Sequence, residues 1–359
     1  MALSLLTGFP GFIGRRLAAR LLEADLEERV VALVERRMLE PARAAAAEID
    51  SERIEVLAGD IAEPRLGLDD AQYERLLAEM RRAYHLAAIY NLAVPLELAQ
   101  RVNVDGTGNV VELCAQARSF ERLAYVSTAY VAGMRTGVVY EHELVLGQRF
   151  KNHYESTKFQ AEVWVRAYLD RVPTTILRPA IVVGDSKTGE TQKFDGPYFI
   201  LRTIAEADRR GRAVPQFGRS DAPFNVVPVD YVVESIVAAA GDPAAEGATL
   251  HLTDPEPLNA SELTIALSEA YGGRKPKGRI PPGMVANSLR VKQVRDRFGG
   301  APRESITYLN HPVAFDTRQA VKVLAPNGLR PPNFGDYVGP MVGFFRENEE
   351  NPDLVPPPS

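Results

Sequence analysis

A tyrosine and a lysine four residues apart are the side chains of this sequence with the clearest chemical potential. They belong to the segment Tyr154-Glu155-Ser156-Thr157-Lys158, within a stretch of helical spacing. Positions four apart share one face of a helix, so the phenol and the ammonium can enter one cleft. A nearby ammonium favours the phenolate and is expected to lower the pKa of Tyr154 from about 10. Such a phenol can give a proton to a carbonyl that accepts a hydride.

Thr128 adds a third group to this pair. It follows the predicted strand 123–127, and its hydroxyl could hold the same carbonyl oxygen. The spacing of Tyr154 and Lys158 is commonplace and by itself favours a solvated pair on a helix surface, and Thr128 is what favours a catalytic site. The three side chains together predict carbonyl reduction, with Tyr154 as the proton donor.

A glycine-rich segment near the N-terminus predicts a dinucleotide site. It reads Thr7-Gly8-Phe9-Pro10-Gly11-Phe12-Ile13-Gly14, after a buried strand and at the start of a helix. The first glycine lets the chain turn, the second lets the backbone approach a pyrophosphate, and the third lets the helix pack on the strand. Free N–H groups at the helix start face the anion. Glycines alone also occur in ordinary strand-to-helix turns, so the alternating elements around them carry the prediction.

Strands and helices alternate through the first half of the chain. Apolar runs predict further strands at 30–34, 54–58, 83–86, 123–127 and 174–178, and helical patterns lie at 12–26, 39–49, 73–80, 104–117 and 154–169. This alternation requires crossover connections, and it predicts an α/β fold with a doubly wound parallel sheet of the Rossmann type. Ligands then bind beyond the carboxyl ends of the strands, where all of these motifs fall.

The chain changes character after Pro179. Residues 184–225 are rich in Gly, Pro and Asp around one helical pattern, 198–207, and this predicts a lid over the site. We then expect a strand at 226–229, a helix at 230–240 capped by Asp230, a strand at 249–253, a helix at 261–271 capped by Ser261, and a frayed tail at 351–359.

These patterns divide the chain into three parts. The Rossmann domain is expected to comprise residues 1–180 with 226–254. A smaller C-terminal part that binds substrate and forms the lid comprises 181–225 and 255–345, and residues 346–359 form a tail.

The composition is that of an ordinary globular enzyme. Hydrophobic residues make up 45% and charged residues 25% of the chain. A net charge of −5 argues against general affinity for nucleic acid. The single cysteine, Cys114, lies in an apolar helical pattern and is expected in the core, which fits a reducing, cytoplasmic compartment. No apolar run approaches the length of a membrane-spanning helix, and the five histidines have no metal-ligand spacing, so no metal is expected.

The ordered motifs resemble the extended short-chain dehydrogenase/reductase family over roughly residues 3 to 255. Beyond the segments already named, they are Gly59-Asp60-Ile61, His85-Leu86-Ala87-Ala88, Asn103-Val104-Asp105-Gly106-Thr107, Val126-Ser127-Thr128-Ala129 and Arg178-Pro179-Ala180. The resemblance implies that Thr128 orients the carbonyl, Tyr154 donates the proton, Lys158 binds the nicotinamide ribose and Asn103 supports the catalytic site. It also implies contact with the dinucleotide for Thr7, Gly8, Gly11, Phe12, Ile13, Gly14, Asp60, Ile61, Ala87, Ala88, Asn103, Ser127, Tyr154, Lys158, Pro179 and Ile181.

Within that family, the chain is most similar to the thioester reductase and fatty acyl reductase branch. Its marks include Val126-Ser127-Thr128-Ala129-Tyr130, the segment 178–184 and Phe315-Asp316-Thr317. This resemblance implies an acyl thioester substrate, reduced to an aldehyde or further to an alcohol. Sugar-nucleotide epimerases and 3-hydroxy or ketone dehydrogenases share most of the framework and stay open as alternatives. A redox sensor that holds NADP without turnover is a third, although it would not need Thr128, Tyr154 and Lys158 together.

The charges after the second strand bear on the choice of cofactor. A carboxylate there binds the ribose of NAD, whereas arginine accommodates the 2′-phosphate of NADP. Glu35 stands where the resembled branch usually has arginine, but Arg36 and Arg37 follow it. We therefore expect NADP, bound through Arg36 or Arg37, with NAD as the alternative.

A basic segment, 274–297, is a candidate for binding a partner. It holds eight basic residues and one acid, Asp296. It could meet the phosphates of CoA, an acidic acyl carrier protein or an anionic membrane surface, and it could also be a solvated face. The family resemblance further implies a homodimer formed through helices such as 104–117 and 154–169.

Overall fold

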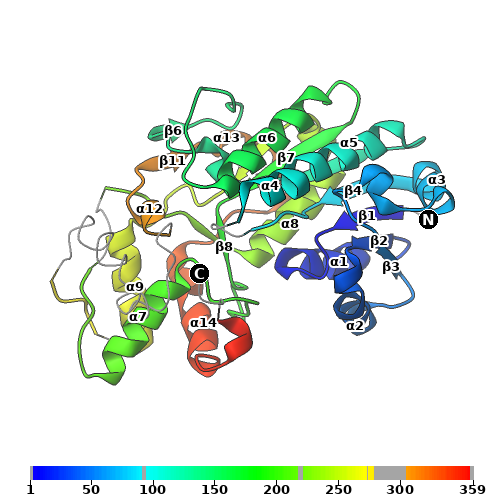
Figure 1. Cartoon of the computed structure of the whole chain (residues 1–359). Coiled ribbons are helices and arrows are strands. Elements are labelled where there is room, and N and C mark those ends of the chain that lie inside the picture. The colour runs from blue at the N-terminus through cyan, green and yellow to red at the C-terminus, as the bar shows by residue number, and fades with distance from the viewer. Residues whose placement is uncertain (1–2, 91–93, 217–220, 273, 279–304, 356–359) are drawn as a thin grey trace.

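The centre of the molecule is a seven-stranded parallel sheet with strand order β10-β7-β5-β4-β1-β2-β3 (Figure 1). The structure is a computed structural model and describes residues 3–90, 94–216, 221–272, 274–278 and 305–355. The strands of the sheet are β1 (Leu3–Thr7), β2 (Arg29–Val34), β3 (Ile54–Ala58), β4 (Met80–His85), β5 (Arg122–Val126), β7 (Thr174–Pro179) and β10 (Thr249–Leu252). This is the predicted doubly wound α/β architecture.

Both faces of the sheet are buried, as strand β2 illustrates. Its alternate residues Val30, Ala32 and Val34 enter one apolar core, and Val31 and Leu33 enter the other. A run without polar alternation is therefore what a strand covered on two sides requires. Over the first core lie α1 (Phe12–Ala24), α2 (Leu39–Ile49), α8 (Val229–Gly241) and α13 (Arg318–Leu324), and over the second lie α3 (Asp70–Glu79), α5 (Gly106–Gln116) and α6 (His153–Ala167).

A third apolar core lies outside the sheet and is built by helices distant in sequence. They are α7 (Tyr198–Arg209), α9 (Ala260–Gly272) and α14 (Phe334–Glu347), packed around aromatic side chains such as Phe194 and Phe345. These helices lie together to one side of the sheet in Figure 1. The short parallel pair β8 (Ile181–Val183) and β9 (Val226–Pro228) lies between this core and the sheet.

Four adjacent strands end together at the edge where the motifs fall. Thr7 of β1 pairs with His85 of β4, and Tyr125 of β5 pairs with both His85 and Ile176 of β7. The residues that follow these strands therefore line one edge of the sheet. The glycine turn, Ala87, Thr128 and Pro179 are brought together in this way.

Two parts of the chain had no prediction from sequence. Strand β6 (Gly137–Val139) pairs in parallel with β11 (Val313–Phe315), and both contribute to a small core with Tyr130. Helices α13 and α14 follow β11.

Shorter helical pieces are Arg36–Met38, Pro64–Gly67, α4 (Leu96–Ala99), Gln100–Asp105, Ala129–Ala132, Pro243–Ala245, α12 (Ser305–Leu309), Ala325–Asn327 and Pro352–Leu354.

Several local predictions were wrong. Asp230 does not cap its helix, since α8 begins at Val229 and the Asp230 carboxylate accepts hydrogen bonds from the Ser186 amide and hydroxyl. Helix α9 is capped by Asn259 and not by Ser261, because the Asn259 side chain accepts from the Ser261 and Glu262 amides.

The tail also differs from the prediction. Over 351–355 it is not frayed, because the chain turns at Pro352–Leu354 and the Leu354 carbonyl accepts a hydrogen bond of 2.7 Å from the Phe194 amide. Residues 356–359 lie outside the described part of the chain.

Candidate active site

Helix α6 brings Tyr154 and Lys158 to the edge of the sheet beside Thr128. The Lys158 side chain is 2% exposed, and its ammonium donates a hydrogen bond of 2.8 Å to the Val126 carbonyl. The same ammonium lies 4.5 Å from the centre of the Tyr125 ring. The Thr128 side chain lies near the Tyr154 phenol and acts to lower its pKa. The structure thus brings together the three side chains that the spacing singled out.

The electrostatics of the pair differ from the prediction. Burial raises the pKa of Tyr154, the Glu155 carboxylate raises it further, and the nearby Thr128 side chain only partly opposes them. Burial lowers the pKa of Lys158 to about 7, against the opposing effect of the Glu162 carboxylate. The expected lowering of the Tyr154 pKa by Lys158 was therefore wrong, because loss of hydration dominates and the Lys158 ammonium is directed at the Val126 carbonyl.

Buried groups fix the first turn of α6. The Asn152 side chain accepts from the Glu155 amide at 2.9 Å, and Glu155 forms a buried ion pair with Lys151 at 3.1 Å. The Tyr308 hydroxyl, from α12, donates to Glu155 at 2.7 Å. Tyr154 lies within this turn, so its backbone is held by both the sheet edge and the C-terminal part of the chain.

The glycine turn is as close-fitting as its motif requires. Gly8 has φ of +89°, and a Cβ there would lie 3.0 Å from the Ala87 amide nitrogen. A Cβ on Gly14 would lie 2.5 Å from the Gly8 carbonyl oxygen. Phe12 and Ile13 begin α1 and pack against the first core. The turn and the amides that open α1 form a cradle of the kind that holds a pyrophosphate.

A chain of hydrogen bonds runs from this turn towards helix α6. Thr107 donates its hydroxyl hydrogen to the Asn103 carbonyl at 2.7 Å, so His85 must donate from Nε2 to the Thr107 oxygen at 3.0 Å. His85 Nδ1 then accepts from the Thr7 hydroxyl at 2.7 Å, and the Thr7 oxygen accepts from the amides of residues 86 and 87. Burial lowers the pKa of His85 to about 3, which keeps the ring neutral.

Asn103 is fully buried and holds the loop beside Tyr154. Its side-chain oxygen accepts from the Ile89 amide at 2.8 Å, and its nitrogen donates to Thr157 of α6 at 3.0 Å. Tyr90 follows Ile89 in the chain and places its ring edge-to-face on Tyr154, with ring centroids 5.0 Å apart. About half of Tyr90 is exposed. Sequence reasoning did not single out Tyr90, although an aromatic residue just after Ala87-Ala88 was an available signal.

The end of the site that would hold the adenosine ribose contains opposing charges. Arg37 forms an ion pair with Glu35 at 2.7 Å, whereas the exposed Arg36 forms no ion pair within the described part of the chain. The Asp60 carboxylate accepts from the Ala62 amide and lies 3.7 Å from an Arg101 nitrogen. Ile61, the next residue, is buried.

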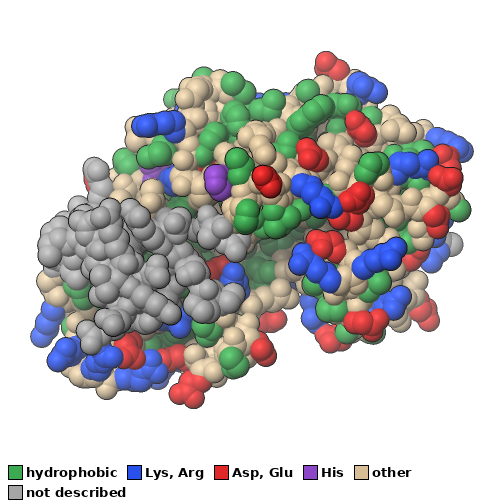
Figure 2. Space-filling view, in the orientation of Figure 1, with side chains coloured by type: hydrophobic (Ala, Val, Ile, Leu, Met, Phe, Trp, Pro, Cys, Tyr) green, Lys and Arg blue, Asp and Glu red, His purple; other side chains and the backbone are tan. Residues whose placement is uncertain are grey.

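The other end of the site lies where β5 and β7 finish. The Thr128 hydroxyl is 3.5 Å from the Pro179 carbonyl, and Ser127 donates to Glu162 at 2.7 Å. Ile181 begins β8, and Ala87 and Ala88 follow β4. Figure 2 shows the surface hollowed between the part that carries the sheet and the part that carries α7 and α14.

Three further predictions concern the basic segment 274–297, a metal site and a membrane-spanning helix. Five of the eight basic residues of 274–297, namely Arg279, Arg290, Lys292, Arg295 and Arg297, lie outside the described residues. Arg274 pairs with Asp208, and Lys275 lies 3.6 Å from Glu269. Among the residues that the structure describes, no cluster of three or more His, Cys, Asp or Glu could hold a metal, and no helix is both long and apolar enough to cross a bilayer.

The fold and this edge of the sheet define the class: an NAD(P)-binding protein of the extended short-chain dehydrogenase/reductase type. The sequence profile of the family described as "Male sterility protein", an NAD-binding family, matches residues 6–236. The chain belongs to this family, whose relatives are NAD(P)-dependent reductases.

Similar proteins are named as synthases, synthetases and reductases. A linear gramicidin synthase from Brevibacillus parabrevis is 30% identical over 279 residues, which cover 74% of this chain and 5% of that protein. The L-2-aminoadipate reductase of Penicillium chrysogenum is 27% identical in its large subunit, over 76% of this chain and 21% of that one. The chain therefore spans only a small part of these relatives.

A solved structure matches the chain over nearly its whole length. The terminal R domain from the myxalamid PKS-NRPS biosynthetic pathway is 28% identical, with a TM-score of 0.82 over 97% of this chain and 91% of that one. The reductase domain of a non-ribosomal peptide synthetase from Mycobacterium tuberculosis has the same fold, with 22% identity and a TM-score of 0.72.

Proposed function

We propose that this chain reduces an acyl thioester to an aldehyde with NADPH. The observation that carries the proposal is the gathering of Thr128, Tyr154 and Lys158, whose ammonium is held on the Val126 carbonyl, at the same sheet edge as the glycine turn. The likeness to the myxalamid terminal R domain and to aminoadipate reductase supports a thioester as the substrate class.

Thr128 and Tyr154 are proposed to bind the carbonyl oxygen of the thioester. Bound nicotinamide would supply the hydride that adds to the carbonyl carbon. As the C=O π bond breaks, the oxygen takes the Tyr154 proton, and the raised pKa of Tyr154 keeps that proton available at neutral pH. The resulting hemithioacetal collapses as its hydroxyl proton is lost, the C=O bond re-forms and the C–S bond breaks; the departing sulfur takes up a proton, so the products are an aldehyde and a free thiol. Lys158, whose ammonium is held on the Val126 carbonyl, is proposed to bind the ribose of the nicotinamide.

The test is turnover of defined thioesters. Purified protein is mixed with NADPH and a series of acyl-CoA and carrier-bound thioesters, and both cofactor oxidation and aldehyde or alcohol formation are recorded. Tyr154→Phe should remove most of the turnover while leaving NADPH binding intact. Turnover of a ketone or 3-hydroxy compound instead would favour the dehydrogenase alternative, and a Tyr154→Phe variant without any functional loss would favour a sensor.

The cofactor is proposed to be NADPH, bound at its 2′-phosphate by Arg36. The Arg36 guanidinium is exposed, whereas Arg37 already forms an ion pair with Glu35. Arg36→Ala is expected to raise KM for NADPH about tenfold or more, with little effect on KM for NADH, because only NADPH carries the charge that Arg36 would pair. Equal effects on both cofactors would contradict the assignment.

We also assign substrate binding to residues 181–225 and 255–345, with residues 1–180 and 226–254 as the dinucleotide domain. The third apolar core supports this division, because most of its residues belong to the proposed substrate-binding part. An acyl carrier protein or CoA is the proposed partner of the basic segment 274–297. The buried Cys114 thiol, whose pKa burial raises, fits the proposed cytoplasmic compartment.

A homodimer through α5 and α6 is proposed as well. Val163 and Trp164 are exposed on α6, with 38% and 48% of their surfaces accessible, and such side chains favour a covered face. Light scattering on the wild type and on Trp164→Glu tests this, since the substitution should yield a monomer.

A further inference from the structure

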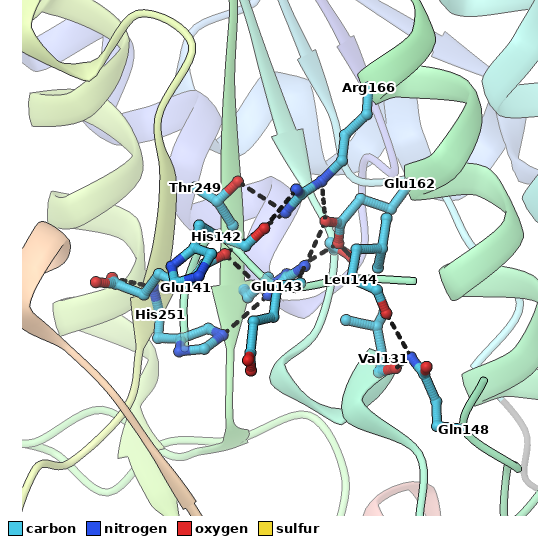
Figure 3. A network of polar contacts seen from close by, with 12 residues as sticks. Val131, Glu141, His142, Glu143, Leu144, Gln148, Glu162, Arg166, Thr249 and His251 are labelled. Carbon is cyan, nitrogen blue, oxygen red and sulfur yellow. Dashed lines mark hydrogen bonds and ion pairs between the residues drawn. The ribbon is translucent and has the colours of Figure 1, made fainter. Parts of the chain in front are cut away.

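The helix face that carries the catalytic pair continues into the protein interior. Tyr154, Lys158, Glu162 and Arg166 follow one another at intervals of four residues on α6. The first two lie at the sheet edge, and Glu162 is fully buried behind them. Figure 3 shows Glu162 at the meeting point of α6 with segments from distant parts of the chain.

Both carboxylate oxygens of Glu162 are fully engaged. Arg178 of β7 donates to them from two nitrogens, at 2.6 and 3.0 Å, a bidentate arrangement. Arg166 donates at 3.1 Å, and the Ser127 hydroxyl donates at 2.7 Å. Ser127 directly precedes Thr128. The end of β5 is therefore held twice by α6, through Lys158 on the Val126 carbonyl and through Glu162 on Ser127.

Arg178 extends this arrangement to the C-terminal part of the chain. It donates to the carbonyl of Glu143 at 2.9 Å and to Nε2 of His251 at 3.1 Å. Because that nitrogen accepts, His251 carries its hydrogen on Nδ1 and donates it to the Asp316 carbonyl at 2.8 Å. Burial lowers the pKa of His251 to about 3, so the ring stays neutral. Pro179, at the edge of the site, is the next residue after Arg178.

Glu162 supplies the negative charge that helps Lys158 to keep its proton. Arg166 and Arg178 form ion pairs with this one carboxylate, and the Glu162 charge, one helical turn from Lys158, opposes the loss of the Lys158 proton that burial favours. The other titratable groups that face Lys158 or Glu162 are Tyr125, Tyr154, His85 and His251. Burial keeps all four neutral at pH 7, so none of them replaces the negative charge.

We propose that Glu162, through its pair with Arg178, is a positioning residue of the reduction: it holds Ser127 and Thr128 opposite Tyr154 and keeps Lys158 cationic. This inference rests on the proposed roles of Thr128, Tyr154 and Lys158. It does not depend on the thioester as substrate, because any carbonyl compound reduced at this site would need the same arrangement.

The test compares Glu162→Gln and Glu162→Asp with the wild type in the full chain. The pH profiles of kcat and of kcat/KM are measured with NADPH and whichever carbonyl substrate the wild type reduces. For Glu162→Gln we expect the alkaline limb to move down by about one pH unit, because an opposite charge on the same helix face is lost. We also expect kcat to fall at least about tenfold while KM for NADPH changes little. Glu162→Asp should keep the wild-type position of the limb with a lower kcat.

Arg122→Gln is the matched control for a lost buried charge. Arg122 is 6% exposed, begins the same strand β5 and donates to Thr175 at the opposite end of the sheet from the site. It should lower stability without moving the pH profile. A Glu162→Gln profile parallel to that of the wild type would overturn the proposal, since a purely structural defect lowers the rate equally at every pH.

Failure to fold would not leave the question open. If Glu162→Gln does not fold, Glu162→Asp and Ser127→Ala carry the test, because both retain the charges around Lys158 while they loosen the hold on Thr128. Wild-type kcat in both variants would overturn the positioning role. If the wild type reduces a ketone but no thioester, the proposed function fails while this inference is still tested on the ketone.

Discussion

Gly14→Ala is expected to disable the dinucleotide site without unfolding the protein. The added Cβ would lie 2.5 Å from the Gly8 carbonyl oxygen and 2.9 Å from its carbonyl carbon. An ordinary contact of about 3.4 Å requires α1 and the turn to separate by roughly 0.9 Å. Overpacking of this kind costs about 1–3 kcal/mol, and the better helix propensity of alanine returns up to about 1 kcal/mol. The net loss of stability is therefore small, about 0–2 kcal/mol.

Binding should suffer far more than stability. The start of α1 would move relative to the turn, and a displacement of about 1 Å in a positioned site can cost about a hundredfold. We expect the Kd for NADPH, measured by quenching of intrinsic fluorescence, to rise between ten- and a hundredfold, while thermal unfolding shifts by only a few degrees.

Gly108→Ala provides the matched control. Gly108 also lies in a helix, α5, and its Cβ would meet no atom within 4 Å. This substitution should leave NADPH binding unchanged and stabilise the protein by up to about 1 kcal/mol. If Gly14→Ala binds NADPH as tightly as Gly108→Ala does, the assignment of the turn as a pyrophosphate cradle is refuted.

Further predictions concern buried and half-buried side chains. Lys158→Met should abolish turnover yet raise the free energy of unfolding by about 1–2 kcal/mol at pH 6. The cost of burying the Lys158 ammonium is present below its folded pKa of about 7 and is relieved above it. Equal gains at pH 6 and pH 9 in denaturant titrations would contradict this. The free energy of unfolding should fall by a few kcal/mol as the pH drops from about 6.5 towards 4. His85 and His251 have folded pKa values of about 3, so over this range only the unfolded chain protonates these two rings. A flat profile of unfolding free energy over this range would count against the buried tautomers. Tyr90→Ala should lower kcat/KM for a carbonyl substrate about tenfold while leaving the Kd for NADPH unchanged, since its exposed ring lies on Tyr154; kcat/KM at the wild-type value would remove Tyr90 from the site.

Most of the fold and the main site were predictable because their signals are local. Two-sided burial produces the apolar run of β2, and the spacing of Tyr154 and Lys158 places them on one helix face whatever lies around them. Helix caps were less predictable, since Asp230 and Asn259 carry equivalent polar atoms and only the neighbouring segment decides which one meets the helix amides.

The C-terminal part was largely unpredictable for a different reason. Helix α14 and strand β11 derive their places from contacts with distant segments, such as the third core and β6. Neither has a strong signal of its own, because β11 is only three residues long and α14 contains Pro340 in its interior. Their formation depends on packing that a local pattern does not contain.

By itself, the sequence determined the alternating fold, the glycine turn and the identities of the side chains proposed to react, since backbone conformation and helical spacing depend on residues close together in the chain. Only the tertiary structure decided the protonation states and the supports of the site. The pKa of Tyr154 rises and that of Lys158 falls because burial removes water from both. The role proposed for Glu162 also depends on the tertiary structure, because only the fold brings Arg178 and Ser127 to the Glu162 carboxylate.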